Sequence, residues 1–186
     1  MMYQNHSLNN NVKRKKSSTI SFRIDSENEK ILRSEAEQKR VSLNTLVNQI
    51  FGEYVEWQRY IERFGTIIMS KDAFRSIIGA LDEQEVINVA ITIASKAPRE
   101  FILFKWKELS AKSVVNFMRM FFEHCGYGQY DYSKNQFTNT FSIHHDLGKK
   151  GSLFLKTYIE TIIKAALEKD CKSIITEDSI VVEFME

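Results

Sequence analysis

The chain has few of the residues that build covalent or metal-based frameworks. It contains two cysteines, Cys125 and Cys171, and a single proline, Pro98. Two distant cysteines are too few for a disulfide framework or a zinc knuckle, so we interpret them as reduced, partly buried thiols. No apolar run approaches the ~18 residues of a membrane helix, and residues 1–11 are too polar for a secretory signal. We therefore expect a protein that stays in the cytoplasm.

Motifs of common enzyme sites are also missing. The sequence has no glycine-rich phosphate loop, no nucleophile elbow and no paired-carboxylate motif. His144-His145-Asp146 is the one cluster with metal-ligand chemistry. On a strand, neighbouring side chains point to opposite faces, so we expect His144 and His145 not to share a metal ion. We expect no catalytic residues, no metal site and no cofactor.

Positive charge is concentrated near the N-terminus. Residues 1–65 hold 11 Lys/Arg against 8 Asp/Glu, a net charge of +3, whereas residues 66–186 hold 15 against 16, a net charge of −1. Residues 1–23 contain no acid at all. We interpret residues 1–17 as a flexible basic arm, although a solubilising tail is the alternative for such a run taken alone. The basic residues of this arm are Lys13, Arg14, Lys15 and Lys16.

Residues 18–24 alternate between apolar and polar side chains. This period of two predicts a strand with one dry face and one wet face. All three polar side chains can donate hydrogen bonds. The apolar positions are Ile20, Phe22 and Ile24, and the polar positions are Thr19, Ser21 and Arg23.

Two helices are predicted after this strand. Asp25 or Ser26 caps the first, which runs to about Arg40 and has a thin apolar stripe. Ser42 caps the second, which runs to about Phe64. The 3–4 spacing of apolar residues in the second helix is typical of an amphipathic helix. Its stripe includes Leu46, Val47, Ile50 and Phe51.

One strand and two helices cannot bury a core alone, and a lone strand leaves both its edges unpaired. Both problems are solved if two chains pair their strands antiparallel and interleave their helices. We therefore predict a homodimer. Its core residues are Ile20, Phe22, Ile24, Leu46, Val47, Ile50 and Phe51.

This order of elements, preceded by a basic arm, resembles the ribbon-helix-helix (Arc/MetJ/CopG-like) superfamily over about residues 18–57. The resemblance implies an intertwined dimer whose two-stranded ribbon lies in the major groove of double-stranded DNA. Two positions depart from the family pattern: Arg40 stands where a glycine is frequent, and Asn28 stands where an apolar side chain is usual. The resemblance implies base contacts from Thr19, Ser21 and Arg23, and phosphate contacts from Lys13, Arg14, Lys15, Lys16, Ser42, Leu43 and Asn44.

Residues 66–186 are predicted to form a separate α+β domain, with helices packed on a small antiparallel sheet. Asp82 and Glu85 are placed for a capping box. Four aromatic residues either line a ligand pocket or belong to the core: Tyr127, Tyr130, Tyr132 and Phe137. Helices are predicted over about 83–96, 110–126 and 151–166, and strands over 101–107, 128–146, 173–177 and 180–185.

The leading interpretation is a sequence-specific transcriptional regulator that acts as a repressor. In this interpretation residues 1–17 are the arm, residues 18–65 bind DNA and dimerise, and residues 66–186 sense a ligand or build a higher oligomer. Any small-molecule effector stays unidentified, and no membrane partner is expected. The alternative is an antitoxin or adaptor whose C-terminal domain binds a partner protein. An enzyme is the third and least favoured interpretation.

Overall fold

The computed structural model describes residues 18–64 and 66–186. The chain divides into two compact units, Met1–Tyr54 and Val55–Glu186. This division falls before the expected boundary at residue 65, because Trp57 and Tyr60 pack against the core of the second unit. The four basic residues of the predicted arm, Lys13 to Lys16, lie outside the described residues.

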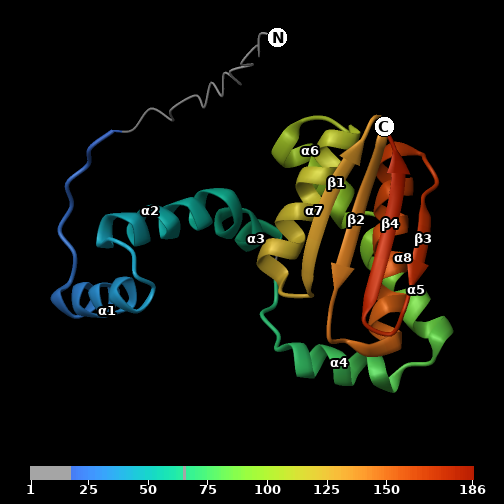
Figure 1. Cartoon of the computed structure of the whole chain (residues 1–186), viewed down its shortest axis with the longest axis horizontal. Coiled ribbons are helices and arrows are strands. Elements are labelled where there is room, and N and C mark those ends of the chain that lie inside the picture. The colour runs from blue at the N-terminus through green and yellow to red at the C-terminus, as the bar shows by residue number, and fades with distance from the viewer. Residues whose placement is uncertain (1–17, 65) are drawn as a thin grey trace, which may run out of the picture. The chain divides into compact units, whose positions relative to one another are not determined.

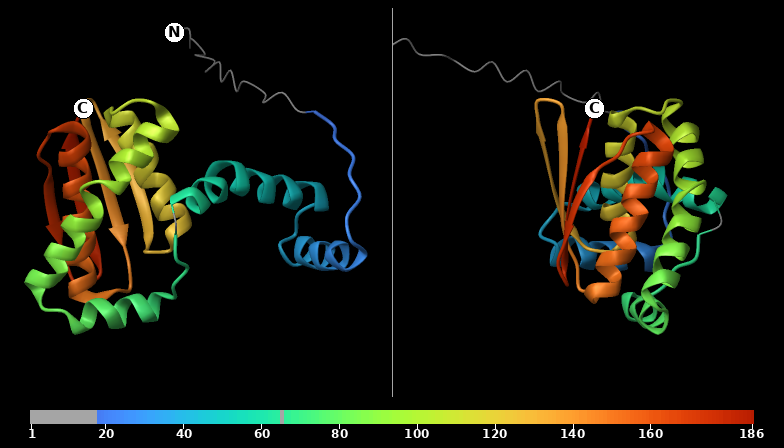
Figure 2. Two further views of the ribbon diagram at one scale, coloured as in Figure 1. Left: turned by 180° about the vertical axis from the view of Figure 1, so that it is seen from behind. Right: turned by 90° about the vertical axis from the view of Figure 1, so that its right-hand side faces the viewer.

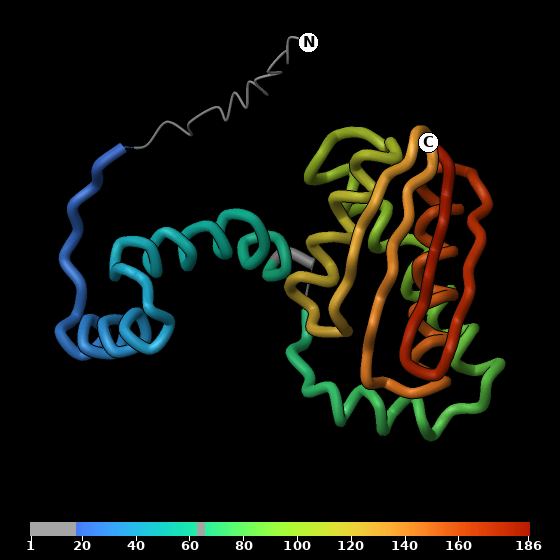
Figure 3. Tube along the Cα trace, in the orientation of Figure 1, coloured from blue at the N-terminus to red at the C-terminus, as the bar shows by residue number. Residues whose placement is uncertain are grey.

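In the first unit, two short helices follow a segment without regular structure. Helix α1 is Ser26–Gln38 and helix α2 is Leu43–Glu53, and Asp25 caps α1 by accepting a hydrogen bond from the Glu27 N–H. Residues 18–25 form neither helix nor strand within the single chain, and their trace runs as a stretched segment into α1 (Figure 3). A strand needs a hydrogen-bonding partner, and the described residues of one chain supply none here.

The chain stays helical beyond α2, as the apolar stripe predicts. A π-helical turn, η1 (Tyr54–Gln58), follows α2 directly, and α3 (Arg59–Phe64) follows η1. A π-turn inserts an extra residue into the ladder and shifts the side chains that come after it. The boundary between the two units, after Tyr54, lies within this helical segment.

The second unit is an α+β structure with a four-stranded antiparallel sheet in the order β1-β2-β4-β3. Helices cover one face of the sheet and leave the other bare (Figure 2, right). The predicted fold class is therefore confirmed for this unit. Its elements, labelled in Figure 1, are α4 (Lys71–Ala80), α5 (Glu83–Ala94), α6 (Ala97–Trp106), α7 (Ala111–Cys125), β1 (Gln129–Asn135), β2 (Thr138–His144), α8 (Gly148–Leu167), β3 (Lys172–Ile175) and β4 (Ser179–Met185).

The core of this unit lies between the sheet and the long helix α8. Phe141 of β2 stands opposite Val182 of β4, and Ile143 stands opposite Ile180, and all four side chains are buried. The alternate positions on these strands are mostly polar, which explains why the bare face tolerates water. No helix in the described part of the chain is long and apolar enough to cross a membrane.

Several details of the second unit differ from the sequence prediction. Residues 101–107, predicted as a strand, lie mainly in α6, because Pro98 opens that helix near its first position instead of closing the preceding one. Residues 128–146 form a hairpin instead of one strand, with Gln136 at positive φ in the turn. Phe137, expected to point inward, is exposed in that turn. Helix α4 was not predicted at all.

Candidate functional site

The predicted dimer face of the first unit is exposed in the single chain. Ile20, Phe22 and Ile24 are 77%, 56% and 42% exposed. Among the described residues of this unit, Ala36 and Leu46 are the only hydrophobic side chains that are buried. The described residues of this unit therefore hold almost no core of their own.

The remaining predicted core residues come from α2. Leu46 is buried and Val47 is half-buried, while Ile50 and Phe51 are exposed. The ring of Phe22 meets the ring of Phe51 edge-on, with 6.0 Å between ring centroids. The structure thus brings one apolar residue of the predicted strand against one of α2 and leaves most of both surfaces uncovered.

The predicted base-contacting side chains are also exposed. Thr19, Ser21 and Arg23 alternate with the apolar positions of the segment, and no hydrogen bond or ion pair joins them to another described residue. Arg33 of α1 differs, because its guanidinium is bound to the Glu29 carboxylate at 2.7 Å. The guanidinium of Arg23 therefore has its full donor capacity available, which a bidentate contact to a guanine requires.

The turn between α1 and α2 has a defined left-handed geometry. Arg40 has φ 55°, the Val41 N–H donates to the Ala36 carbonyl at 2.9 Å, and the Arg40 N–H donates to the Glu37 carbonyl at 3.0 Å. These two bonds define a Schellman motif in which Arg40 occupies the position usually held by glycine. Arg40 is therefore a point of backbone strain.

The start of α2 presents free backbone donors. The Ser42 hydroxyl accepts a hydrogen bond from the Thr45 N–H at 3.0 Å, so Ser42 is the N-cap, as predicted. The first-turn N–H groups of Leu43 and Asn44 have no partner among the described residues. Free N–H groups at the positive end of a helix dipole are suited to bind a phosphate oxygen.

The histidines of the second unit do not form a metal site in the described part of the chain. His144 is exposed at the end of β2, whereas His145 is buried. His124 stacks on Trp57 with ring centroids 5.0 Å apart. The three histidines therefore have three separate environments.

His145 belongs to a buried hydrogen-bond network. Its Nδ1 accepts from the Leu147 N–H at 3.2 Å, which leaves Nε2 as the protonated nitrogen, 2.9 Å from the Ser152 hydroxyl. Ser152 in turn donates to the Glu177 carbonyl at 3.0 Å. Burial lowers the pKa of His145 against the opposing pull of nearby Asp178 and Asp146. The network fits the neutral imidazole, and it joins the residues after β2 to α8 and to the turn before β4.

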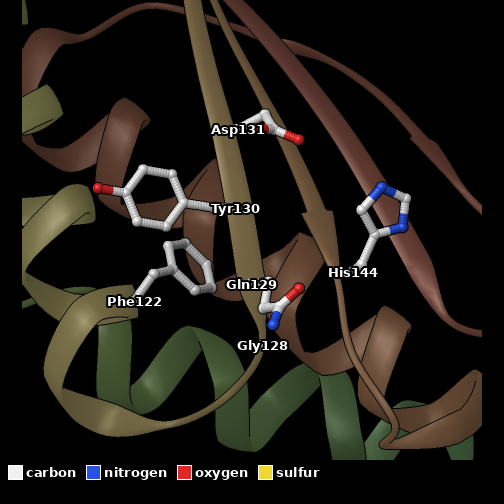
Figure 4. A pocket seen from close by; sticks show the side chains of 6 residues that line it. All are labelled: Phe122, Gly128, Gln129, Tyr130, Asp131 and His144. Atoms are coloured by element: carbon white, nitrogen blue, oxygen red, sulfur yellow. The ribbon is translucent and has the colours of Figure 1, made fainter. Parts of the chain in front are cut away.

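A shallow hollow of about 440 Å³ lies beside β1. Figure 4 shows Phe122 and Tyr130 on one side of the strand and His144 on the other. The Tyr130 hydroxyl donates to the Glu123 carboxylate at 2.6 Å and so is already engaged. The hollow has no converging set of reactive groups. The backbone of His144 passes so close to Gly128 that a Cβ there would lie 2.3 Å from the His144 carbonyl oxygen, which explains the glycine at this position.

A second cavity, of about 320 Å³, is lined almost entirely by aromatic and aliphatic side chains. Tyr127 is the one lining residue that the sequence marks as a pocket candidate. Trp57 and Ile61 escape prediction because they lie on a helix assigned to the first domain, and Tyr158 because its spacing on α8 fits a simple core stripe. The fold brings these distant residues together through tertiary packing.

The chain matches no known protein-family model, and no curated protein matches it.

Proposed function

We propose that this protein is a sequence-specific DNA-binding transcriptional regulator, in which residues 18–54 of two chains form a dimeric β-ribbon that enters the major groove. The observation that carries this proposal is the alternating, exposed apolar row at Ile20, Phe22 and Ile24, next to two helices with almost no core. Exposed alternating residues on an unpaired segment are stabilised when a second copy supplies the missing strand and the missing core.

Pairing of these rows turns the other side of the ribbon outward. Side chains alternate across a strand, so Thr19, Ser21 and Arg23 share the face opposite the apolar row. A two-stranded ribbon fits the width of the major groove. In this proposal Arg23 donates two hydrogen bonds to a guanine, and Thr19 and Ser21 contact neighbouring base edges.

Phosphate contacts hold the ribbon in register without reading sequence. The free N–H groups of Leu43 and Asn44, with the cap Ser42, are the proposed anchor for one phosphate on each side of the dimer. The arm from Lys13 to Lys16 supplies further phosphate contacts. Repression is the proposed mode of regulation, because occupying the DNA is sufficient for it.

The proposal is tested by selection of binding sites from a random double-stranded library with the full chain, followed by titration of the selected site. Arg23→Ala should weaken binding by about 1–3 kcal/mol per protomer and relax the preference at one base pair in each half-site. Arg33→Ala is the matched control, since it removes the same charge from an exposed helix position. Equal affinities for the two variants would refute base reading by Arg23.

The arm is tested separately through salt dependence. An alanine variant of the arm should show a shallower slope of log K against log salt, with the base preference unchanged. The magnitude of the slope should fall by about 0.9 for each phosphate that the arm neutralises. The variant replaces Lys13, Arg14, Lys15 and Lys16. An unchanged slope would remove the arm from the interface.

A further inference from the structure

The cavity in the second unit has walls made of flat aromatic faces. Phe121 stacks on Tyr127, with ring centroids 4.9 Å apart, and on Tyr158, with centroids 5.0 Å apart. Phe74 packs edge-on against Tyr127 and against Phe154, at 5.2 Å in each case. These rings hold one another in position, so the faces that border the cavity are fixed before any molecule enters it.

The hydroxyl of Tyr158 lies on this wall without a hydrogen-bonding partner among the described residues. Tyr158 is 6% exposed, and its hydroxyl makes no hydrogen bond with any residue that the structure describes. Among the described residues, the unpaired side-chain polar atoms that are sealed from solvent belong to Asn139 and Ser173, so the Tyr158 oxygen borders open space. An unpaired hydroxyl in an apolar setting is costly unless a ligand or water satisfies it.

The chemistry of the remaining wall is neutral. None of the lining residues that the structure describes carries a charge. Burial raises the pKa of Tyr127 to about 12, and it also raises the pKa of Tyr158, so both phenols stay protonated and act as hydrogen-bond donors at physiological pH. A charged molecule would lose its hydration here without gaining a counter-charge.

We propose that this cavity is a binding site for a small, flat, uncharged aromatic molecule with one hydrogen-bond acceptor, which takes the hydrogen bond of the Tyr158 hydroxyl. The volume of about 320 Å³ stands at the lower end of ligand sites and fits one or two fused rings. Trp57 of η1 and Ile61 of α3 line the same space, so the molecule contacts the helical segment that follows α2 in the chain. The proposal is independent of DNA binding, because binding of the small molecule itself is measured.

The test uses two planar probes of nearly the same shape, 2-acetylnaphthalene and 2-isopropenylnaphthalene, which differ by a carbonyl oxygen in place of a CH₂ group. Binding is followed by quenching of Trp57 fluorescence in full-length Trp106→Phe protein, which has no other tryptophan. The ketone should bind about 2- to 10-fold more tightly than the hydrocarbon, the range expected for one net hydrogen bond.

Tyr158→Phe should abolish this difference by weakening the ketone alone. Tyr130→Phe, which removes a phenol bonded to Glu123 outside the cavity, should preserve it. Because Tyr158→Phe removes an unpaired oxygen, the variant should fold with an undiminished melting temperature, which thermal unfolding checks. Failure of both probes to quench Trp57 would overturn the proposal, and so would equal affinities that Tyr158→Phe leaves unchanged.

Discussion

Replacing Ile20 with threonine tests the proposed dimer face with the least disturbance to a single chain. Ile20 is 77% exposed, so its change costs the isolated protomer little, and threonine keeps the β-branching that favours a strand. Full burial of an isoleucine contributes about 1.5–3 kcal/mol. Since threonine keeps one methyl group, each copy should lose about 1–2 kcal/mol, and the dimer about 2–4 kcal/mol.

This loss corresponds to a dimer dissociation constant about 30- to 1,000-fold weaker. Sedimentation equilibrium over a dilution series measures it directly. The matched control is Ile68→Thr, the same change at a residue that is 95% exposed in the second unit. If both variants dimerise as the unchanged chain does, or if the unchanged chain is a monomer at micromolar concentration, the reasoning is refuted.

Three further predictions concern stability. Arg40→Gly should raise the free energy of unfolding by about 0.5–1 kcal/mol, because relief of the left-handed backbone exceeds the added chain entropy of glycine. Lys39→Gly is the control, and because Lys39 has φ −79° it should lower the free energy of unfolding. Urea titration measures both variants, and the opposite sign for Arg40→Gly would contradict the prediction. Ser42→Ala should cost about 1 kcal/mol in the same assay and Ser42→Asp should restore it, whereas a neutral Ser42→Ala would mean that the cap is not formed. His145 has a lowered pKa in the folded state, so the unfolded chain binds the proton first as the pH falls. The contribution of His145 to stability should therefore be full above pH 6.5 and decline below it. His145→Asn should reduce this decline in thermal melts at pH 5–8, and an unaltered pH profile would contradict the role given to His145.

Local patterns predicted those elements whose signal is short-range. The capping box of Asp82 and Glu85 opens α5 as expected, and Gly126 ends α7 at φ 67°. Both depend on residues within one helical turn of each other, so the sequence contains the whole physical cause.

Elements decided by distant packing were predicted less well. The stretch around Phe101 and Ile102 is rich in aromatic and β-branched residues and looks like a strand, yet both side chains are buried as part of helix α6, which begins at Ala97. Propensity is a weak prior where tertiary burial decides the conformation. The hairpin turn at Gln136 lacks the glycine or asparagine that normally marks a left-handed position.

The candidate sites divide in the same way. Thr19, Ser21 and Arg23 are contiguous on one segment, so a period of two was sufficient to select them. The aromatic cavity is lined by residues from different helices and from the α7–β1 turn, among them Trp57, Tyr127 and Tyr158. No spacing in the sequence predicts that these residues lie close together. The unpaired state of the Tyr158 hydroxyl is likewise a property of the packed structure.

The proposed pairing of residues 19–24 with their copy in a second chain is tested most directly by isotope-filtered NMR on a mixed-label sample of the full-length protein. We predict Hα–Hα contacts between protomers across this segment, with slow amide exchange at its paired positions. Absence of contacts between protomers, or helical chemical shifts over these residues, would contradict it.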